Sequence, residues 1–265
     1  MIKDITIGQY IPGESFIHKL DPRTKILISF LFIISLFIID KFVGYIFVVA
    51  FLALVVYVAK ISPRYLYKGL KPVFLLIALT AILNIFMLKD GNLIFDFGFI
   101  KIYDSGIKIA FFMAMRLILL IMGTSVLTLT TSPIELTDGI ERLLKPIGKE
   151  IAHELAMMMT IALRFIPTLI DETDKIMKAQ KARGADFESG GLVKKAKSLI
   201  PLLVPLFISS FRRADELAMA MEARCYRGGA GRTRMKVLKF NSRDFVAFGV
   251  FALLVVSIIV VRFII

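Results

Sequence analysis

Five long apolar stretches, separated by polar and charged segments, dominate the hydropathy pattern of the chain. A helix needs about 20 mainly apolar residues to cross the hydrocarbon core of a bilayer, with a range of about 17–25. The pattern therefore predicts five transmembrane helices, of which the first and third are at the short limit. They are expected over Thr24–Ile39, Phe42–Ala59, Pro72–Leu88, Ile107–Thr131 and Asp244–Ile265.

The segment from Ser132 to Arg243 is too polar to span a membrane simply and too apolar to be a linker. Thr131-Ser132-Pro133-Ile134-Glu135 is typical of a helix start, with a hydroxyl cap, a proline in the first turn and then an acid. We expect this first helix to end near Lys145-Pro146. The chain is therefore predicted to be an all-α integral membrane protein, with a four-span membrane region (1–131), a block of about three helices (132–243) and a last transmembrane helix (244–265).

Two long helices are expected inside this block, at Glu150–Arg183 and Leu192–Arg224. Pro167 should kink the first, and Gly184 stands where a C-terminal cap belongs. Pro201 and Pro205 are expected to bend the second.

The distribution of charge predicts the orientation. The formal net charge is +13, and the Lys and Arg residues cluster in the N-terminal segment, in the loop between the second and third spans, and in 132–243. Cytoplasmic loops carry the excess of basic residues in membrane proteins. The N-terminus and the helical block are therefore predicted to be cytoplasmic, with a lipid bilayer as a partner. No nucleic-acid recognition motif accompanies the charge, so we expect no nucleic acid.

The two long helices end in similar sequences. Asp174 precedes Ala182-Arg183-Gly184 as Asp215 precedes Ala223-Arg224-Cys225, with the aspartate nine residues before the arginine in each. Small neighbours would let such a helix end enter a groove on another protein. The planar guanidinium could there bind a carboxylate or backbone carbonyls. The alternative interpretation is that each arginine neutralises the negative end of its helix dipole.

These residues resemble the energy-coupling factor transporter transmembrane component (the T component, EcfT family), which belongs to a bacterial and archaeal class of ABC importers. The resemblance covers essentially the whole chain. It rests on Gly8–Gly13 with Leu20-Asp21-Pro22-Arg23-Thr24-Lys25, on Ala162-Leu163-Arg164-Phe165-Ile166-Pro167 leading to Ala182-Arg183-Gly184, and on Arg213-Ala214-Asp215 leading to Ala223-Arg224. The family pattern has Ala-Arg-Gly at both sites, so Cys225 departs from it.

The resemblance implies a coupling subunit for vitamin or micronutrient uptake in the plasma membrane of a prokaryote. Its expected partners are two ABC ATPase subunits and one small substrate-binding S component. Coupling or helix pairing is expected of Asp174, Asp215 and Arg164. The expected ATPase-docking residues are Ala182, Arg183, Gly184, Ala223, Arg224 and Cys225.

Several chemistries find little support in the sequence. No P-loop is present, since Gly148-Lys149 is followed by Glu150, so ATP and Mg are expected on the partner subunits and no cofactor on this chain. His153-Glu154 begins like a zinc-protease motif, but position 157 is Met, and we expect no metal and no catalytic residue.

Arg116 lies inside the fourth predicted span, where a charge is costly and often functional. It could contact the S component, or it could extend its guanidinium to the membrane interface. A stand-alone secondary transporter or a membrane enzyme remains the alternative function, although the predicted spans carry few polar groups.

Overall fold

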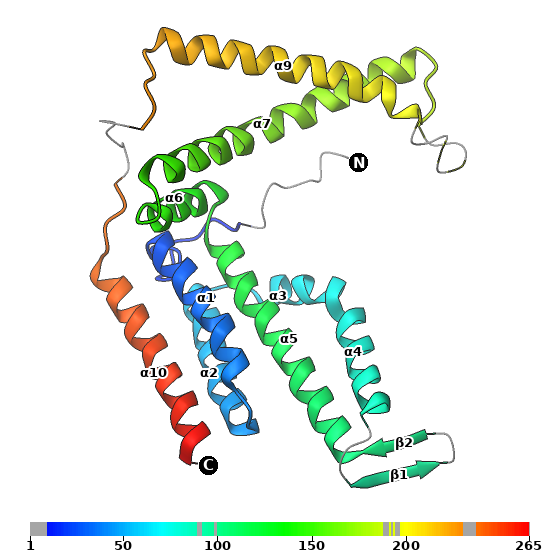
Figure 1. Ribbon diagram of the computed structural model, residues 1–265, viewed down its shortest axis with the longest axis vertical. Helices are drawn as coiled ribbons and strands as arrows, with labels where there is room; N and C mark the ends of the chain where they lie inside the picture. Colours follow the sequence, from blue (N-terminus) through cyan, green and yellow to red (C-terminus); the bar gives the residue numbers. More distant parts are fainter. Residues whose placement is uncertain are drawn as a thin grey trace. The chain divides into compact units, whose positions relative to one another are not determined.

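The computed structural model describes residues 10–88, 92–97, 100–187, 191, 193, 197–229 and 237–264. Over these residues the chain divides into two compact units (Figure 1). One, called the membrane unit below, contains residues 10–139 and 237–264. The other, called the helical-pair unit, lies within residues 140–229.

Helices make up nearly all of the membrane unit, which confirms the predicted all-helical class. A hairpin of β1 (Leu93–Phe97) and β2 (Ile100–Tyr103) joins two of them, and sequence reasoning did not anticipate it. The helices are α1 (Pro22–Ile38), α2 (Phe42–Ala59), α3 (Pro63–Leu70), the 3-10 turn η2 (Lys71–Val73), α4 (Phe74–Met87), α5 (Asp104–Thr130) and α10 (Ser242–Ile264).

Five helical segments of the described chain are long and apolar enough to cross a membrane. Four of them overlap predicted spans, namely α2, the α3–α4 segment, α5 and α10, and the α3–α4 segment begins at Pro63, before the expected Pro72. α1 was expected to be a span, but it has 17 residues and is not among the five. The fifth is instead α7 (Lys149–Ala182), whose mean hydropathy of 1.3 is below the 2.1–2.7 of the others.

The segment after α2 also differs from its expectation. The basic segment after Ala59 was predicted to be a loop, but most of it forms α3. Lys60 ends α2 in the left-handed conformation, with φ of 55°, and Pro63 occupies the first turn of α3. Proline is well suited to that position because its missing N–H would have no helical partner there.

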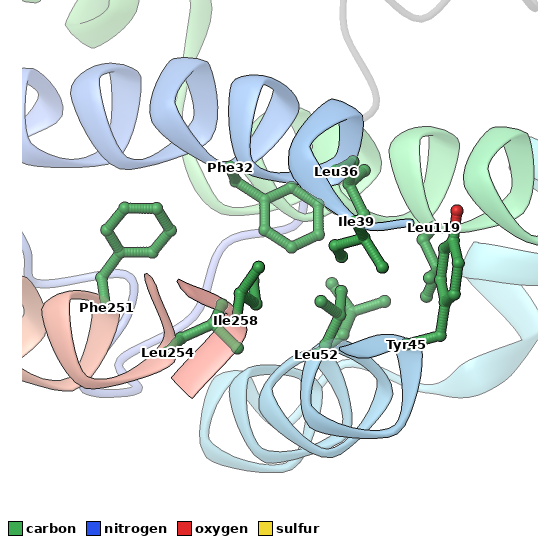
Figure 2. Close-up of a cluster of buried hydrophobic side chains, with 10 residues drawn as sticks. Phe32, Leu36, Ile39, Tyr45, Leu52, Leu119, Phe251, Leu254 and Ile258 are labelled. Atoms are coloured by element: carbon green, nitrogen blue, oxygen red, sulfur yellow. The ribbon is translucent and has the colours of Figure 1, made fainter. Parts of the chain in front are cut away.

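The core of the membrane unit lies between α1, α2, α5 and α10, and Figure 2 shows their apolar side chains pointing toward one another. Close approach of α1 and α5 depends on Gly123, because a Cβ at that position would lie 2.4 Å from Cε1 of Phe32. Small residues commonly allow such contacts between membrane helices. The buried residues of this core are Phe32, Leu36, Ile39, Tyr45, Val48, Leu52, Leu119, Phe251, Leu254 and Ile258.

A buried carboxylate joins the first and last helices of the membrane unit. Asp244, in the first turn of α10, is 1% exposed. Its Oδ1 accepts a hydrogen bond from the backbone N–H of Asp21 at 2.9 Å, and its Oδ2 accepts one from Asn241 at 2.8 Å. Asp21 in turn caps α1 and pairs with the guanidinium of Arg23. One side chain therefore satisfies backbone donors at the start of two helices.

A buried lysine attaches the end of α5 to the same region. Nζ of Lys25 donates to the carbonyl oxygen of Thr130 at 2.9 Å and to that of His18 at 3.1 Å. His18 is held by the Ser15 hydroxyl and the Ile11 carbonyl. Burial lowers the pKa of His18, and Lys25 nearby lowers it further. The Asp-Pro-Arg-Thr-Lys motif therefore organises one end of the membrane unit.

The remaining helices are α6 (Pro133–Leu144), α7 and α9 (Ile200–Ala223). The hydroxyl of Ser132 accepts a hydrogen bond from the N–H of Glu135, as expected of the predicted cap. The second long helix was expected from Leu192, which lies with 194–196 outside the described residues. Val193, Lys197 and Ser198 are helical, and α9 begins at Ile200 with Pro201 in its first turn. Pro201 therefore starts this helix instead of bending it, while Pro167 and Pro205 lie inside their helices as predicted.

Candidate functional site

α7 and α9 form an antiparallel pair within the helical-pair unit (Figure 1). Near the end of α7, Nε2 of Gln180 donates to the carbonyl oxygen of Pro201 at the start of α9, at 3.1 Å. Nη2 of Arg213 lies 3.1 Å from Oε2 of Glu172 and joins the two helices again. Because the helices run in opposite directions, Arg183 and Arg224 stand at opposite ends of the pair. The 24 residues of α9 separate them by about 36 Å at about 1.5 Å per residue.

The two helix ends have the same backbone structure. At the end of α7, the N–H of Gly184 donates to the carbonyl of Lys181, and the N–H of Ala185 donates to that of Gln180. At the end of α9, Cys225 and Tyr226 repeat both bonds at equivalent positions, to Glu222 and Met221. This is the Schellman motif, in which the residue after the cap adopts a left-handed conformation. The resemblance seen in the sequence is therefore also a resemblance of backbone geometry.

Cys225 takes the left-handed position that glycine occupies at the other end. Its φ is +54°, and that of Gly184 is +86°. A left-handed conformation costs a residue with a Cβ roughly 1–2 kcal/mol. The departure from the family pattern thus leaves the local backbone unchanged and adds strain.

Replacing Cys225 with glycine should stabilise the end of α9 by about 1 kcal/mol, because it removes this strain. Replacing Gly184 with alanine should destabilise the end of α7 by a similar amount. Nothing lies within 4 Å of the added Cβ, so the cost is conformational alone. Hydrogen exchange of the amide at Tyr226 measures the first change, with exchange about five-fold slower in Cys225→Gly. Unchanged or faster exchange would contradict the strain.

The six expected docking residues are exposed at both helix ends. Within the described residues, the guanidinium groups of Arg183 and Arg224 make no ion pair and no hydrogen bond to the last carbonyls of their helices. Backbone N–H groups already satisfy carbonyls there. An interaction with the helix dipole needs no hydrogen bond, so docking and dipole neutralisation both stay predictions for the two arginines. The exposed residues are Ala182, Arg183, Gly184, Ala223, Arg224 and Cys225.

Coupling or helix pairing by Asp174, Asp215 and Arg164 stays a prediction. Asp174 is half-buried, while Asp215 and Arg164 are exposed, and among the described residues the three make no hydrogen bond or ion pair with one another. Glu172 and Arg213 make the ion pair instead. Arg213 opens the second motif, Arg213-Ala214-Asp215, and Glu172 lies two positions before Asp174. Their partnership across 41 positions left no local signal.

A second set of contacts ties the segment after Arg224 to the start of α7, and sequence reasoning missed it. The Tyr226 hydroxyl lies 3.3 Å from Nε2 of His153, and Nδ1 of His153 lies 3.5 Å from the buried carboxylate of Glu141. A Cβ on Gly229 would lie 2.6 Å from the His153 ring, so glycine is required for this approach. His153 thus has a structural role, and no metal-binding group of three ligands is found among the described residues.

Arg116 has its contacts inside the membrane unit. Nη2 lies 3.4 Å from the carbonyl oxygen of Ile39, at the end of α1, and the guanidinium lies 5.1 Å from the centre of the Phe37 ring. A cation at the C-terminal end of a helix interacts favourably with its dipole. These contacts satisfy part of the guanidinium, while its Nε is buried without a hydrogen-bond partner among the described residues. The expected contact with an S component stays a prediction.

Comparison with known proteins shows which family this chain resembles. The family model described as "Cobalt transport protein" (CbiQ) matches residues 13–237. A protein from Clostridium kluyveri is 68% identical over 250 residues, covering 93% of both chains. One from Thermosediminibacter oceani is 60% identical over 265 residues, covering 99% of this chain and all of the relative. One from Bacillus subtilis is 48% identical over 246 residues, covering 92% and 93%. Each of these relatives is named "Energy-coupling factor transporter transmembrane protein EcfT".

Proposed function

The chain belongs to the family of energy-coupling factor transporter transmembrane proteins, and from this premise we propose that it is the non-catalytic coupling subunit of such an importer. It is a multi-pass membrane component of a transporter with further components. We further propose that the ends of α7 and α9 bind two ATPase subunits. ATP and Mg would be bound and used on those subunits.

The observation that carries this proposal is the pair of matching, exposed arginine ends. Both present Ala-Arg followed by a left-handed residue, and they stand about 36 Å apart by the length of α9. A single small groove cannot bind both ends at that separation. Two copies of similar sockets, on two ATPases, fit the geometry. Arginine is a frequent anchor at interfaces because its planar group makes several directed hydrogen bonds.

The contacts between α7 and α9 support transmission of motion. Links at Gln180–Pro201 and Glu172–Arg213 join the helices at two levels, so a displacement of one end carries the other helix with it. Movement of the ATPases on ATP binding would then shift the helical pair as a unit. We propose that this shift reorients an S component that delivers a vitamin or another micronutrient. The proposed location is the plasma membrane of a prokaryote, with the N-terminus and the helical pair in the cytoplasm. This proposal places α7 outside the bilayer although it is long and apolar enough to span, because its mean hydropathy of 1.3 is the lowest of the five.

A pull-down of the tagged full chain in gentle detergent, with mass spectrometry of the bound proteins, tests this function. Two ABC-type ATPases and a small hydrophobic protein are expected, with ATP hydrolysis by the complex and none by the purified chain. Recovery of the chain alone, with transport by it in liposomes, would instead favour the stand-alone transporter and refute the coupling role.

The lone cysteine gives a direct test of orientation and docking. Cys225 is exposed and stands beside Arg224. A membrane-impermeant maleimide should label it in inside-out vesicles and leave it unlabelled in intact cells. Bound ATPases should slow the labelling at least ten-fold, and removing them should restore it. Labelling from the outside would refute the orientation. Labelling at the same rate with and without the ATPases would refute docking at this end. Cys225→Ser supplies the unlabelled control.

A further inference from the structure

We propose that the outward face of α3 binds the headgroups of anionic phospholipids. α3 is a short amphipathic helix attached to the body of the membrane unit. Leu66 is 4% exposed and packs in the cluster with Ala59, Val126 and Leu129. A Cβ on Gly69 would lie 3.0 Å from the Ser125 hydroxyl of α5, so the two helices are in close contact there. α3 is thus held in place, with one face toward the protein.

The opposite face carries three cations. At about 100° per residue, Arg64, Lys68 and Lys71 fall within a sector of about 60°, on the side away from Leu66 and Gly69. All three are exposed. In the described part of the chain, none of them forms an ion pair. Their charge is therefore available to an external anion.

The start of α4 fixes the depth of this face in a membrane. Phe74 and Leu75 follow directly and are 70% and 79% exposed, as expected of side chains among lipid tails. Leu75 follows Lys71 by four positions, or about 6 Å along a helix. Lys71 consequently lies about one turn beyond the apolar start of α4, near the level of lipid phosphates. Tyr65 and Tyr67, 43% and 68% exposed, supply aromatic rings typical of the interface.

The direction of α3 also suits a membrane surface. Figure 1 shows α3 lying across the direction of α4 and α5, with the change of direction at η2, which contains Pro72. An amphipathic helix in this arrangement lies along the interface. An acidic protein could also complement three cations. Lipid is the better fit because the face borders the exposed apolar start of α4, and anionic lipid lies next to it in the membrane.

Titration of phosphatidylglycerol into the purified full chain in neutral detergent, followed by native mass spectrometry, tests the proposal. Arg64→Gln combined with Lys68→Gln and Lys71→Gln should weaken phosphatidylglycerol binding at least five-fold, about the effect expected of one cation at a membrane surface. Binding of phosphatidylcholine should be unchanged. Arg64→Lys keeps the charge and should bind phosphatidylglycerol like the wild type, which separates the loss of charge from a loss of fold.

Lys175→Gln, Lys178→Gln and Arg212→Gln together remove the same charge from exposed positions on α7 and α9. This matched control should retain phosphatidylglycerol binding. The proposal is overturned if the α3 variant binds this lipid like the wild type, or if the control loses as much. It is also overturned if the α3 variant keeps the lipid and loses a soluble protein in the pull-down, since the face would then be a protein interface.

Discussion

Arg183→Glu combined with Arg224→Glu should abolish both ATPase association and transport, while the protein still inserts in the membrane. Each change puts a carboxylate where the proposed socket receives a guanidinium. Loss of an arginine anchor typically costs 2 kcal/mol or more, or at least roughly 30-fold in affinity. Each single change should therefore weaken docking. Because the two ends act together on one complex, the double change also removes the gain from simultaneous binding.

Copurification of the ATPases in gentle detergent measures this effect. Lys175→Glu with Arg212→Glu is the matched control, because it reverses two exposed charges on the same helices away from their ends. The control should keep both ATPases. Normal copurification with the double arginine variant would refute docking through these ends, whatever happens to transport.

Asp244→Ala should destabilise the membrane unit by about 3 kcal/mol. The change leaves the N–H of Asp21 without its acceptor in a buried place, and an unsatisfied buried donor costs about 1–3 kcal/mol. It also removes the part-buried hydrogen bond from Asn241. Asp244→Asn keeps the shape and one acceptor oxygen, so it should lie between the alanine variant and the wild type. Circular dichroism during thermal unfolding in detergent provides the measurement.

The matched control for this prediction is Asp40→Ala. Asp40 lies 3.3 Å from Arg262, but both side chains are about half exposed, and such a pair contributes less than about 1 kcal/mol. A destabilisation by Asp244→Ala no larger than that of Asp40→Ala would show that the buried carboxylate does not join the helices.

Sequence pattern predicted the parts of this fold that depend on local signals. α2 has the bounds that were expected, because an uninterrupted apolar run ends at Lys60. α6 begins at its predicted hydroxyl and proline, and α7 ends at its predicted glycine. Each of these boundaries is marked by a change in hydropathy or by a proline or glycine, whose backbone preferences are strong.

The errors arose where two physical preferences compete. Cations typical of loops concealed α3, although Leu66 and Gly69 carry its buried face. Pro201 is compatible with either the start or the interior of a bent helix, and only the structure places it in the first turn.

The candidate site was also predictable only in part. The paired arginine ends were visible as a repeat within the sequence. Their shared left-handed geometry was not, because a cysteine gives no signal for positive φ. Links such as Glu172–Arg213 and Tyr226–His153 join residues 41 and 73 positions apart. One sequence contains no local indication of which distant polar groups will meet.

The buried Asp244 has a consequence for biosynthesis. It is the acceptor for a backbone donor 223 positions earlier, at the start of α1. A ribosome delivers the first helix long before the last, so the start of α1 lacks this acceptor until α10 emerges. Folding of the N-terminal helix is thereby completed by the C-terminal one. Chains cut short before α10 would lack this acceptor, so only a finished molecule has both ends of the chain joined at the start of α1.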